Sequence, residues 1–444
     1  MKVTVPNFPA PSLPSSRGGK QERGSLDGEI RWSLAGDWSV AMVGAHGLRQ
    51  ELLMAPPKMS RVRDEKAEGG LPEKQPTADG WLLGFPLKGV RAEECTIPGA
   101  LLPETLAIKS SPGAAGPVFV RGRDYEFDAT WGTVWRLPGG KLAAGQEVWM
   151  DYAHVPQRLD SAVLTRPGQV VIREGTPHPA MPEPPPLAEG ERRLANIYLP
   201  GPMGRLGEFH LFPILETVYP EEPSRGPSPA ETFLPRTMAR LRSGEPLKIL
   251  AWGDSVTAAG RFQPLFLAHL RRRFPQAEIE LVTEAWPGKN TVDYLAEPPG
   301  SGRNFAEKVL ALKPDLILSE FVNDASLRES PGETRARYER IREAFRGIGA
   351  EWILLTPHYV KPDWMGLDRQ RNIDDDPRPY VRFLREFAQD HHIALADTSR
   401  RYGRLWRQGI PYLTLMENGI NHPNLAGHQI LADSLMALFP GNCP

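Results

Sequence analysis

A serine and a histidine in the C-terminal half of the sequence are the first candidates for chemistry. Ser255 lies in the segment GDSVT, directly after the apolar run LKILAW, and His422 lies in the segment NHPN. A serine hydroxyl is a poor nucleophile until an imidazole accepts its proton, and the same imidazole can later protonate a leaving alcohol. The tripeptide GDS alone fits a helix N-cap serine equally well, so the assignment depends on the rest of the chain.

Two further residues with suitable chemistry follow apolar runs in the same region. Gly288 lies in the segment EAWPGKN after IELVT, and Asn323 follows DLILSEFV. A glycine allows its backbone N–H to approach a ligand closely, and an asparagine offers a side-chain amide as a hydrogen-bond donor. Asn323 and Asp324 together could also be a simple turn signal, with Asp324 bracing the loop.

The elements that must position these residues alternate regularly beyond Glu231. Five apolar runs predict strands: LKILAWG, IELVTEA, DLILSEF, EWILLTP and IALAD. Amphipathic segments that predict helices lie at 263–273, 304–312, 334–347, 378–391 and 424–438. Continuous apolar strands that alternate with helices indicate a parallel sheet covered on both faces. Ligands of such sheets bind at the carboxyl ends of the strands, where all four candidates are expected.

The order Ser255, Gly288, Asn323, His422 resembles the SGNH (GDSL-like) hydrolase superfamily over about residues 247–438. The resemblance implies a three-layer αβα domain with a flavodoxin-like parallel sheet, and a carboxylic ester hydrolase. It also implies Ser255 as the nucleophile and His422 as its base. The main-chain N–H groups of Ser255 and Gly288 and the side-chain amide of Asn323 would then form the oxyanion hole.

The sequence departs from this superfamily at the acid of the triad. Most members carry an aspartate three residues before the histidine, and here that position is Gly419. One interpretation is a Ser-His dyad in which a main-chain carbonyl or Asn418 orients the imidazole. The other is that a carboxylate such as Glu417 takes the place of the aspartate. The dyad is favoured, because the orienting group must hold the ring more than it must accept a proton.

Further residues near the same sheet edge are candidates for substrate contact. Asp254 is one of them, although capping of the following turn is the preferred interpretation. His358, at the end of the fourth predicted strand, is a second. The remaining candidates for lining the pocket are Lys289, Asn290, Trp286, Trp364 and Tyr359.

The N-terminal half has a different pattern, in which short apolar runs alternate with glycine and proline. Runs at 118–120, 125–127, 134–137, 148–152 and 170–172 predict a sandwich-like or small barrel domain. We expect a flexible arm at 1–25, a β-rich accessory domain at 26–220, a Pro-rich linker at 221–236 and the hydrolase domain at 237–444. The accessory domain could bind carbohydrate, form a lid or mediate oligomerisation, and Trp131, Trp135 and Trp149 are expected in its core.

The composition excludes several classes of partner. Lys and Arg total 53 against 54 Asp and Glu, a net charge of −1, which gives no electrostatic reason to expect nucleic acid. No run is long enough to span a membrane, and no signal peptide is visible, so the chain as given is expected in the cytoplasm, or secreted if an export signal was removed. The two cysteines and the histidines lack metal-site spacing, and the aspartates at 374–376 lack the remaining ligands of a calcium loop. We expect no metal and no cofactor.

Three functions are compatible with these observations. The first is an esterase that removes acyl groups, in particular acetyl groups, from a carbohydrate. The second is a lysophospholipase or thioesterase, which would require a long apolar channel, whereas the loops here are polar and rich in proline. The third is an inactive hydrolase fold that binds a glycan or a protein. The sequence does not determine the acyl group, the alcohol or the oligomeric state.

Overall fold

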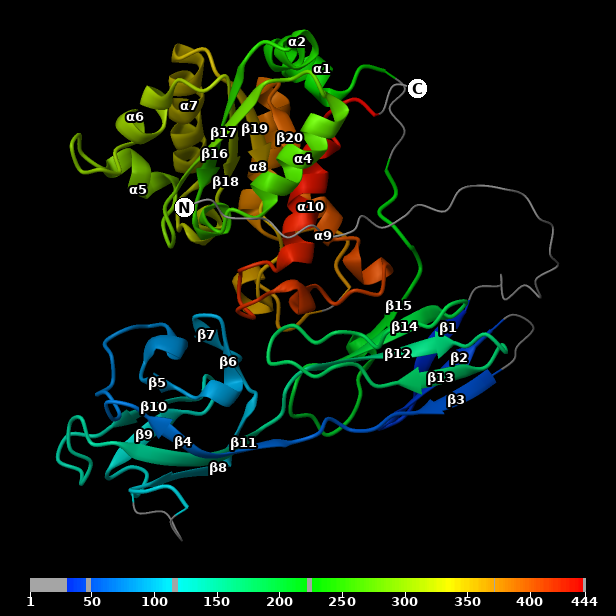
Figure 1. Cartoon of the computed structure of the whole chain (residues 1–444), viewed down its shortest axis with the longest axis vertical. Helices are drawn as coiled ribbons and strands as arrows, with labels where there is room; N and C mark the ends of the chain where they lie inside the picture. Colours follow the sequence, from blue (N-terminus) through cyan, green and yellow to red (C-terminus); the bar gives the residue numbers. More distant parts are fainter. Residues whose placement is uncertain (1–29, 45–48, 114–118, 222–225, 371, 442–444) are drawn as a thin grey trace.

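The computed structural model describes residues 30–44, 49–113, 119–221, 226–370 and 372–441. The predicted arm at 1–25 and residue 118 of one predicted strand lie outside these ranges. Within them the chain forms an α/β domain at the C-terminal end and antiparallel β structure before it (Figure 1). Both parts of the predicted fold class are thereby confirmed.

The centre of the C-terminal domain is a parallel sheet of five strands. The strands are β16 (Leu247–Gly253), β17 (Ile279–Ala285), β18 (Leu316–Glu320), β19 (Glu351–Leu355) and β20 (Ala394–Ala396), in the order β17-β16-β18-β19-β20. This is the flavodoxin-like order, in which the first strand lies between the second and the third and the connections diverge on either side of it. Gly253, the last residue of β16, pairs with Ala285 on one side and Glu320 on the other. The carboxyl ends of three strands therefore meet at the residue before Asp254.

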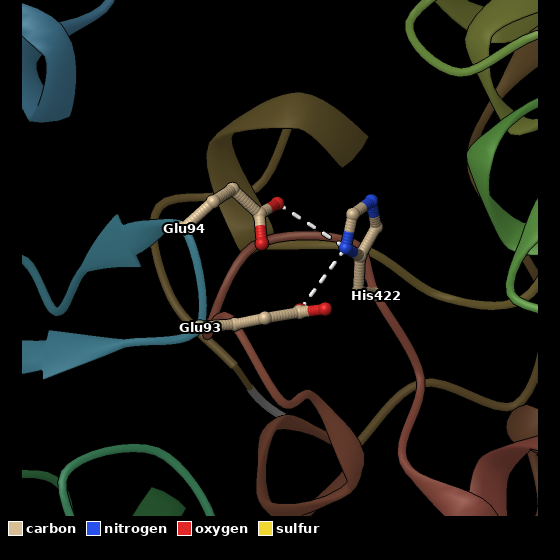
Figure 2. A group of neighbouring side chains, drawn as sticks. All are labelled: Glu93, Glu94 and His422. Atoms are coloured by element: carbon tan, nitrogen blue, oxygen red, sulfur yellow. Dashed lines mark hydrogen bonds and ion pairs between the residues drawn. The ribbon is translucent and has the colours of Figure 1, made fainter.

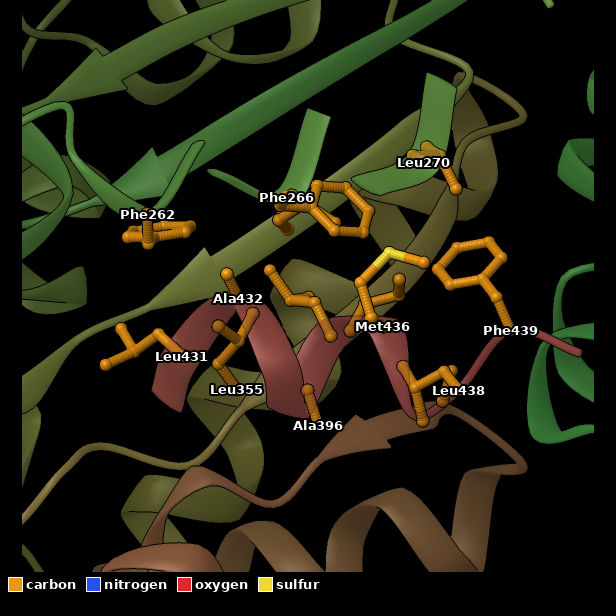
Figure 3. Packing of buried hydrophobic residues seen from close by; sticks show 14 of the residues in the cluster. Phe262, Phe266, Leu270, Leu355, Ala396, Leu431, Ala432, Met436, Leu438 and Phe439 are labelled. Atoms are coloured by element: carbon orange, nitrogen blue, oxygen red, sulfur yellow. The ribbon is translucent and has the colours of Figure 1, made fainter. Parts of the chain in front are cut away.

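Helices cover both faces of this sheet. As a result, neighbouring residues of the central strands are buried on opposite sides. Ile249 packs in one apolar cluster and Leu250 in the other. The first cluster involves α1 (Pro229–Phe233), α2 (Pro235–Ser243), α4 (Phe262–Arg273) and α10 (Leu425–Met436). Figure 3 shows Phe262, Phe266 and Leu270 of α4 above Leu431, Ala432 and Met436 of α10. The second involves α5 (Thr291–Ala296), α6 (Phe305–Lys308), α7 (Pro331–Gly347) and α8 (Pro379–His391).

Two short helices complete the domain near the ends of the sheet. They are α3 (Ser255–Ala258), directly after β16, and α9 (Thr398–Tyr402), after β20. The stretch predicted as a Pro-rich linker, 221–236, contains α1 and the beginning of α2. Ala230 and Leu234 from this stretch are fully buried in the hydrolase core. No helix in the described ranges combines the length and the apolar character needed to cross a membrane.

The β structure before this domain contains two units with separate apolar cores. One unit joins the sheet β1 (Arg31–Gly36), β2 (Ser39–Val43), β3 (Arg49–Leu53) to the sheet β13 (Val170–Arg173), β12 (Arg158–Leu164), β14 (Arg192–Leu199), β15 (Leu211–Pro213). Val40 and Met42 of the first sheet share a core with Ala162 and Ile197 of the second. We call this unit the outer β unit.

The other unit lies between β3 and β12 in the sequence, and we call it the inserted β unit. It contains the sheet β4 (Ser60–Ala67), β11 (Val148–His154), β8 (Leu101–Lys109), the sheet β5 (Phe85–Pro86), β10 (Thr133–Arg136), β9 (Tyr125–Asp128), and the hairpin β6 (Arg91–Ala92), β7 (Cys95–Thr96). Val134, Val148 and Met150 are fully buried in its core. Figure 1 shows the inserted β unit beside the outer one, with β6 and β7 on the side that faces the hydrolase domain.

Candidate active site

Ser255 is placed by the tight turn that ends β16. Asp254 caps the short helix that Ser255 begins, and its Oδ1 accepts a hydrogen bond from the N–H of Val256 at 3.1 Å. The preceding Gly253 has no room for a side chain, since a Cβ there would lie 2.4 Å from the carbonyl oxygen of Glu320. The close approach of β16 and β18 thus requires glycine at this position and fixes where Ser255 leaves the sheet.

His422 faces Ser255 from the loop before α10. Its Nε2 lies 3.1 Å from the Oγ of Ser255, which is hydrogen-bond distance. The loop is held by Asn418, whose Oδ1 accepts hydrogen bonds from the N–H groups of Ile420, Asn421 and His422 at 2.9 to 3.0 Å. The structure therefore brings the predicted nucleophile and base together and gives Asn418 the role of organising the loop.

The other nitrogen of the imidazole faces two glutamates of the inserted β unit. Nδ1 of His422 lies 3.1 Å from Oε2 of Glu93 and 3.2 Å from Oε1 of Glu94. Figure 2 shows both carboxylates directed at this nitrogen from the turn between β6 and β7. Sequence reasoning missed these two residues, because they belong to the β-rich half of the chain. The only signal was the missing aspartate at Gly419.

The sequence suggested the side chains of Asn418 and Glu417 as the groups that orient the imidazole of His422. Neither of them pairs with Nδ1 of the ring, which faces Glu93 and Glu94. The carboxylate of Glu417 forms an ion pair with Arg261. Asn418 directs its amide nitrogen at Oε1 of Glu94, at 3.0 Å, and at Oδ1 of Asn421. Asn418 therefore contacts the ring only through Glu94 and through the backbone that carries it.

Gly288 and Asn323 lie on neighbouring loops at the same sheet edge. Asn323 follows β18, where its N–H donates to Oδ2 of Asp254 at 3.0 Å and its side-chain Nδ2 donates to the carbonyl oxygen of Lys289 at 3.1 Å. The second bond ties the Asn323 amide to the residue directly after Gly288. Gly288 has a φ of 73°, a conformation that glycine adopts without strain. An Nδ2 group carries two hydrogens, so one remains for a substrate oxygen.

The residues predicted as low-ranking substrate contacts mostly have structural positions. Asp254 is completely buried beneath the serine turn. Asn290 is the N-cap of α5, in a reciprocal pair with Asp293. Lys289 is partly exposed, 3.4 Å from Asp293 and 5.2 Å from the ring centre of Trp286. Of these three, Asp254 is closed to a substrate, whereas Lys289 and Asn290 are both partly exposed.

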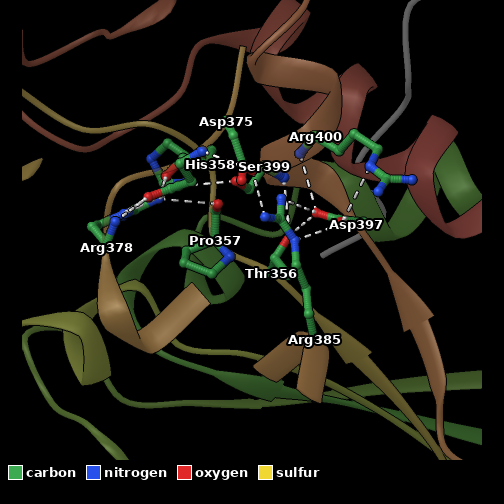
Figure 4. A network of polar contacts seen from close by, with 10 residues as sticks. Thr356, Pro357, His358, Asp375, Arg378, Arg385, Asp397, Ser399 and Arg400 are labelled. Atoms are coloured by element: carbon green, nitrogen blue, oxygen red, sulfur yellow. Dashed lines mark hydrogen bonds and ion pairs between the residues drawn. The ribbon is translucent and has the colours of Figure 1, made fainter. Parts of the chain in front are cut away.

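His358 is also buried, so it supports the site from behind instead of facing a substrate. Its Nε2 lies 2.7 Å from the carbonyl oxygen of Asn421, next to His422. Burial lowers the pKa of His358 to about 3, so the ring is neutral and donates to that carbonyl. Arg378 in turn donates to the carbonyl oxygen of His358 at 2.7 Å, as part of the network in Figure 4.

The aspartates at 374–376 are engaged by arginines of the hydrolase domain. Asp375 pairs with Arg385 at 2.5 Å, and Asp376 pairs with Arg378 at 2.6 Å. Asp374 pairs with Arg407 at 2.9 Å. These contacts give the acidic run a structural role near the loop that carries His358 (Figure 4).

Two buried carboxylates lie directly under the site. Burial raises the pKa of Asp254 above its ordinary value, and the charge of Asp324 adds to the rise, while N–H donors from Asn323 and Val256 oppose it. Asp324 accepts hydrogen bonds from the N–H of Thr291 at 2.9 Å and from the hydroxyls of Thr291 and Tyr338. It thereby connects the loop after β18 to the first turn of α5 and to α7.

A groove of about 570 Å³ lies where the inserted β unit meets the hydrolase domain. Trp81 and Trp131 line it from the β side, with ring centres 5.0 Å apart, and Trp364 lines it from the hydrolase side. Trp364 is 45% exposed. Gly419, from the loop that carries His422, also lines the groove, which places it beside the candidate site.

Comparisons with known proteins identify one matching family and several similar structures. No curated protein sequence matches the chain, but residues 251–430 match the GDSL-like Lipase/Acylhydrolase family. Similar solved structures include a mutant of Axe2, an acetyl-xylooligosaccharide esterase from Geobacillus stearmophilus, at 21% identity over 43% of this chain and 93% of that chain, with a TM-score of 0.36. A two-domain esterase active on acetylated mannans, CEX, co-crystallised with mannopentaose, is 19% identical over 48% of this chain and 56% of that chain, with a TM-score of 0.36.

A third similar structure is that of TesA. It is 20% identical over 42% of this chain and 95% of that chain, with a TM-score of 0.32. Each of these three similarities covers less than half of the chain. The assignment rests on the family match, which contains Ser255, Gly288, Asn323 and His422. Residues 251–430 therefore form a domain of the GDSL-like lipase/acylhydrolase family, a family of carboxylic ester hydrolases.

Proposed function

We propose that this protein is a serine esterase that removes acetyl groups from a carbohydrate. The observation that carries the esterase proposal is the distance of 3.1 Å between Oγ of Ser255 and Nε2 of His422. A hydroxyl and an imidazole at this distance, at the carboxyl end of a parallel sheet, have the geometry of an activated nucleophile.

The reaction follows from this geometry in two transfers. Oγ of Ser255 attacks the carbonyl carbon of the ester while Nε2 of His422 takes the hydroxyl proton. The bond between that carbon and the alcohol oxygen then breaks, and His422 gives its proton to the departing alcohol. A water molecule repeats the sequence on the acyl-enzyme, which releases the carboxylic acid and restores the serine.

Negative charge that develops on the carbonyl oxygen needs donors near Ser255. The N–H groups of Ser255 and Gly288 and the second hydrogen of Asn323 Nδ2 serve this purpose in the proposal. The support for it is that Asp254 and Lys289 hold Asn323 at two points, so the amide is already oriented before substrate binds. Donors of this kind stabilise the transition state by about 3 kcal/mol each.

The groove beside the site supports a carbohydrate as the alcohol part of the substrate. Sugars present apolar C–H faces, which stack on aromatic rings, and hydroxyls, which bond to carboxylates and amides. The groove combines Trp81, Trp131 and Trp364 with the polar side chains of Asp79 and Gln157. Its volume lies within the ordinary range of ligand pockets. An acetylated sugar at Ser255 would have its neighbouring sugars in this groove.

The carbohydrate proposal predicts a selective effect of Trp364→Ala. The change should raise KM for acetylated xylo- or manno-oligosaccharides about fivefold to tenfold, because a stacking face worth about 1 kcal/mol is lost. It should leave kcat/KM for p-nitrophenyl acetate unchanged, since that ester does not reach the groove. Phe209→Ala, at a partly exposed aromatic residue that does not line this groove, is the control. Equal losses on both substrates would contradict the role of the groove.

Covalent labelling tests the esterase proposal directly. A fluorophosphonate probe should modify the wild-type protein once, and mass spectrometry of the digested protein should locate the adduct on Ser255. Unlabelled protein from the same preparation should release acetate from p-nitrophenyl acetate and from acetylated polysaccharide, and the labelled protein should not. A protein that neither reacts with the probe nor hydrolyses any short acyl ester would instead be a binding module with a hydrolase fold.

A further inference from the structure

Gly419 occupies the position where relatives of this domain carry the acid of the triad, and the structure shows that an aspartate there would be strained. Gly419 has a φ of 69°, and a Cβ at this position would lie 2.4 Å from Cδ1 of Ile97. Ile97 belongs to the inserted β unit and follows the β6–β7 hairpin directly. The inserted β unit thus packs directly against the position that the acid would occupy.

We propose that the Glu93–Glu94 pair in the turn of this hairpin replaces the missing aspartate, so that the inserted β unit completes the catalytic site of the hydrolase domain. This inference rests on the proposed esterase function and names two further positioning residues for it. The pair holds the imidazole from the Nδ1 side while Nε2 faces Ser255.

The geometry fixes which tautomer of His422 the pair stabilises. A carboxylate is an acceptor only, so Glu93 at 3.1 Å holds the ring proton on Nδ1. Nε2 then carries a lone pair and can accept the proton of Ser255. After that transfer the imidazolium lies between two carboxylates and the serine oxygen, and their charge stabilises it.

The backbone conformation of Glu93 would suit glycine better, which indicates that the side chain of Glu93 has a function. Ala92 pairs with Cys95, so Glu93 and Glu94 are the two central residues of the turn. Glu93 has a φ of 53°, and Glu94 is not among the residues with positive φ in the described part of the chain. A turn with positive φ at its first central position favours glycine, and a glutamate there is strained. Strain of this kind is typical of functional positions.

The base of the hairpin is anchored, so the two carboxylates are presented on a fixed support. Immediately before β6, the N–H of Lys88 donates to Oε1 of Glu65 at 3.0 Å, and the N–H of Gly89 donates to the hydroxyl of Tyr152 at 2.7 Å. Glu65 lies on β4 and Tyr152 on β11, two neighbouring strands of the inserted β unit.

The two glutamates differ in their surroundings, which gives them different tasks. Burial raises the pKa of Glu93, the neighbouring Glu94 adds to the rise, and His422 opposes it. Burial acts in the same direction on Glu94, but the amide of Asn418 and the charge of His422 outweigh it and the pKa of Glu94 is lowered. Glu94 is therefore the more firmly ionised of the two, tied to the loop of His422, and Glu93 makes the hydrogen bond to the ring.

A cation bound by the same residues would be a competing role. The ligand atoms of Glu93, Glu94 and His422 lie within 4.8 Å of one another, which is close enough to hold a metal ion. A metal on Nδ1 would move the ring proton to Nε2, where it would donate to Ser255 instead of accepting its proton. The two roles exclude each other, so Zn²⁺ should inhibit the enzyme and EDTA should not reduce its activity.

Glu93→Gln and Glu94→Gln, separately and combined, test the pair in the full chain. Each single change should lower kcat for p-nitrophenyl acetate about tenfold, and the double change about a hundredfold or more, with KM little changed. Glu147→Gln, a carboxylate of the same β unit that pairs with Lys66, is the matched control and should keep wild-type kcat. A double variant with wild-type kcat would overturn the proposal.

Glu93→Gly separates loss of the carboxylate from damage to the fold. Glycine adopts positive φ without strain, so the melting temperature should equal or exceed that of the wild type while kcat falls. Sodium formate should restore part of the lost activity, whereas sodium chloride at the same ionic strength should not. Loss of activity that formate does not restore, with a lowered melting temperature, would show that Glu93 is structural.

The pH dependence of kcat/KM also tests the pair. It would not change if Glu93 and Glu94 were only structural. The other ionisable groups that act on His422 are Asp254, His358 and His428, and the variants leave all three in place. With one carboxylate removed, the imidazolium releases its proton more readily, so the acid limb of kcat/KM should move to lower pH in Glu94→Gln. If the acid limb of kcat/KM in Glu94→Gln lay at the same pH as in the wild type, Glu94 would have no electrostatic role. Failure of the esterase proposal is recognised separately. In that case Ser255→Ala would also keep full activity, whereas failure of the Glu93–Glu94 proposal alone would leave Ser255→Ala inactive.

Discussion

Replacing Ser255 by alanine is expected to lower kcat/KM for p-nitrophenyl acetate by about 10³-fold or more. The alanine variant has no oxygen to form the acyl-enzyme, and what remains is hydrolysis by water aided by the oxyanion donors. The fold should be intact, because Asp254 caps the following turn through the N–H of Val256 and not through the serine side chain. Initial rates at several enzyme concentrations, with the melting temperature measured in parallel, check this result.

Combining Ser255→Ala with His422→Ala tests whether the two residues act as a unit. Because His422 acts only through the hydroxyl of Ser255, the double variant should lose no more activity than Ser255→Ala alone. Ser243→Ala, at an exposed serine on α2, is the control and should leave the rate unchanged. Additive losses in the double variant would mean that the two residues act separately and that the distance of 3.1 Å between them has no catalytic meaning.

The α/β domain and half of its site could be predicted because the information is local. Strands buried on both faces are continuous apolar runs, such as LKILAW, and three of them lead into Ser255, Gly288 and Asn323. Parallel pairing brings these ends together without any knowledge of the side-chain contacts. Ser255 is predicted from that rule, and His422 from the family resemblance.

The Glu93–Glu94 pair could not be predicted, because its role depends on contacts between distant parts of the chain. Glu93 and His422 are 329 positions apart. The hairpin strands β6 and β7 have two residues each, too short for any alternation to show. The positive φ of Glu93 and the contact of Ile97 with Gly419 are properties of the folded chain alone. The sequence signalled only that an acid was missing.

The β-rich half shows a similar division between local and distant information. The runs at 125–127, 134–137, 148–152 and 170–172 coincide with β9, β10, β11 and β13. Their partners could not be read from the sequence, and the strands divide between two units, one inserted in the other. Of the three tryptophans expected in a core, Trp135 is buried, Trp149 is only half-buried beside Lys66, and Trp131 lines the groove.

Asn323→Ala is expected to lower kcat by about 10²-fold to 10³-fold with little change in KM. The side-chain amide is proposed to bond more strongly to the charged oxygen of the tetrahedral intermediate than to the neutral carbonyl of the ester, so its loss acts on the transition state. The backbone of the residue should stay in place, because its N–H bond to Asp254 does not involve the side chain. Steady-state kinetics on p-nitrophenyl acetate measure both constants.

The matched control for this change is Asn304→Ala. Asn304 is the N-cap of α6 and accepts hydrogen bonds from the N–H groups of Ala306 and Glu307. Its loss should cost about 1 kcal/mol of stability and leave kcat unchanged. Asn323→Ala should show the opposite pattern, with a large fall in kcat and a small change in melting temperature. If both variants lost stability and activity together, Asn323 would be a loop residue and the oxyanion hole would consist of backbone N–H groups alone.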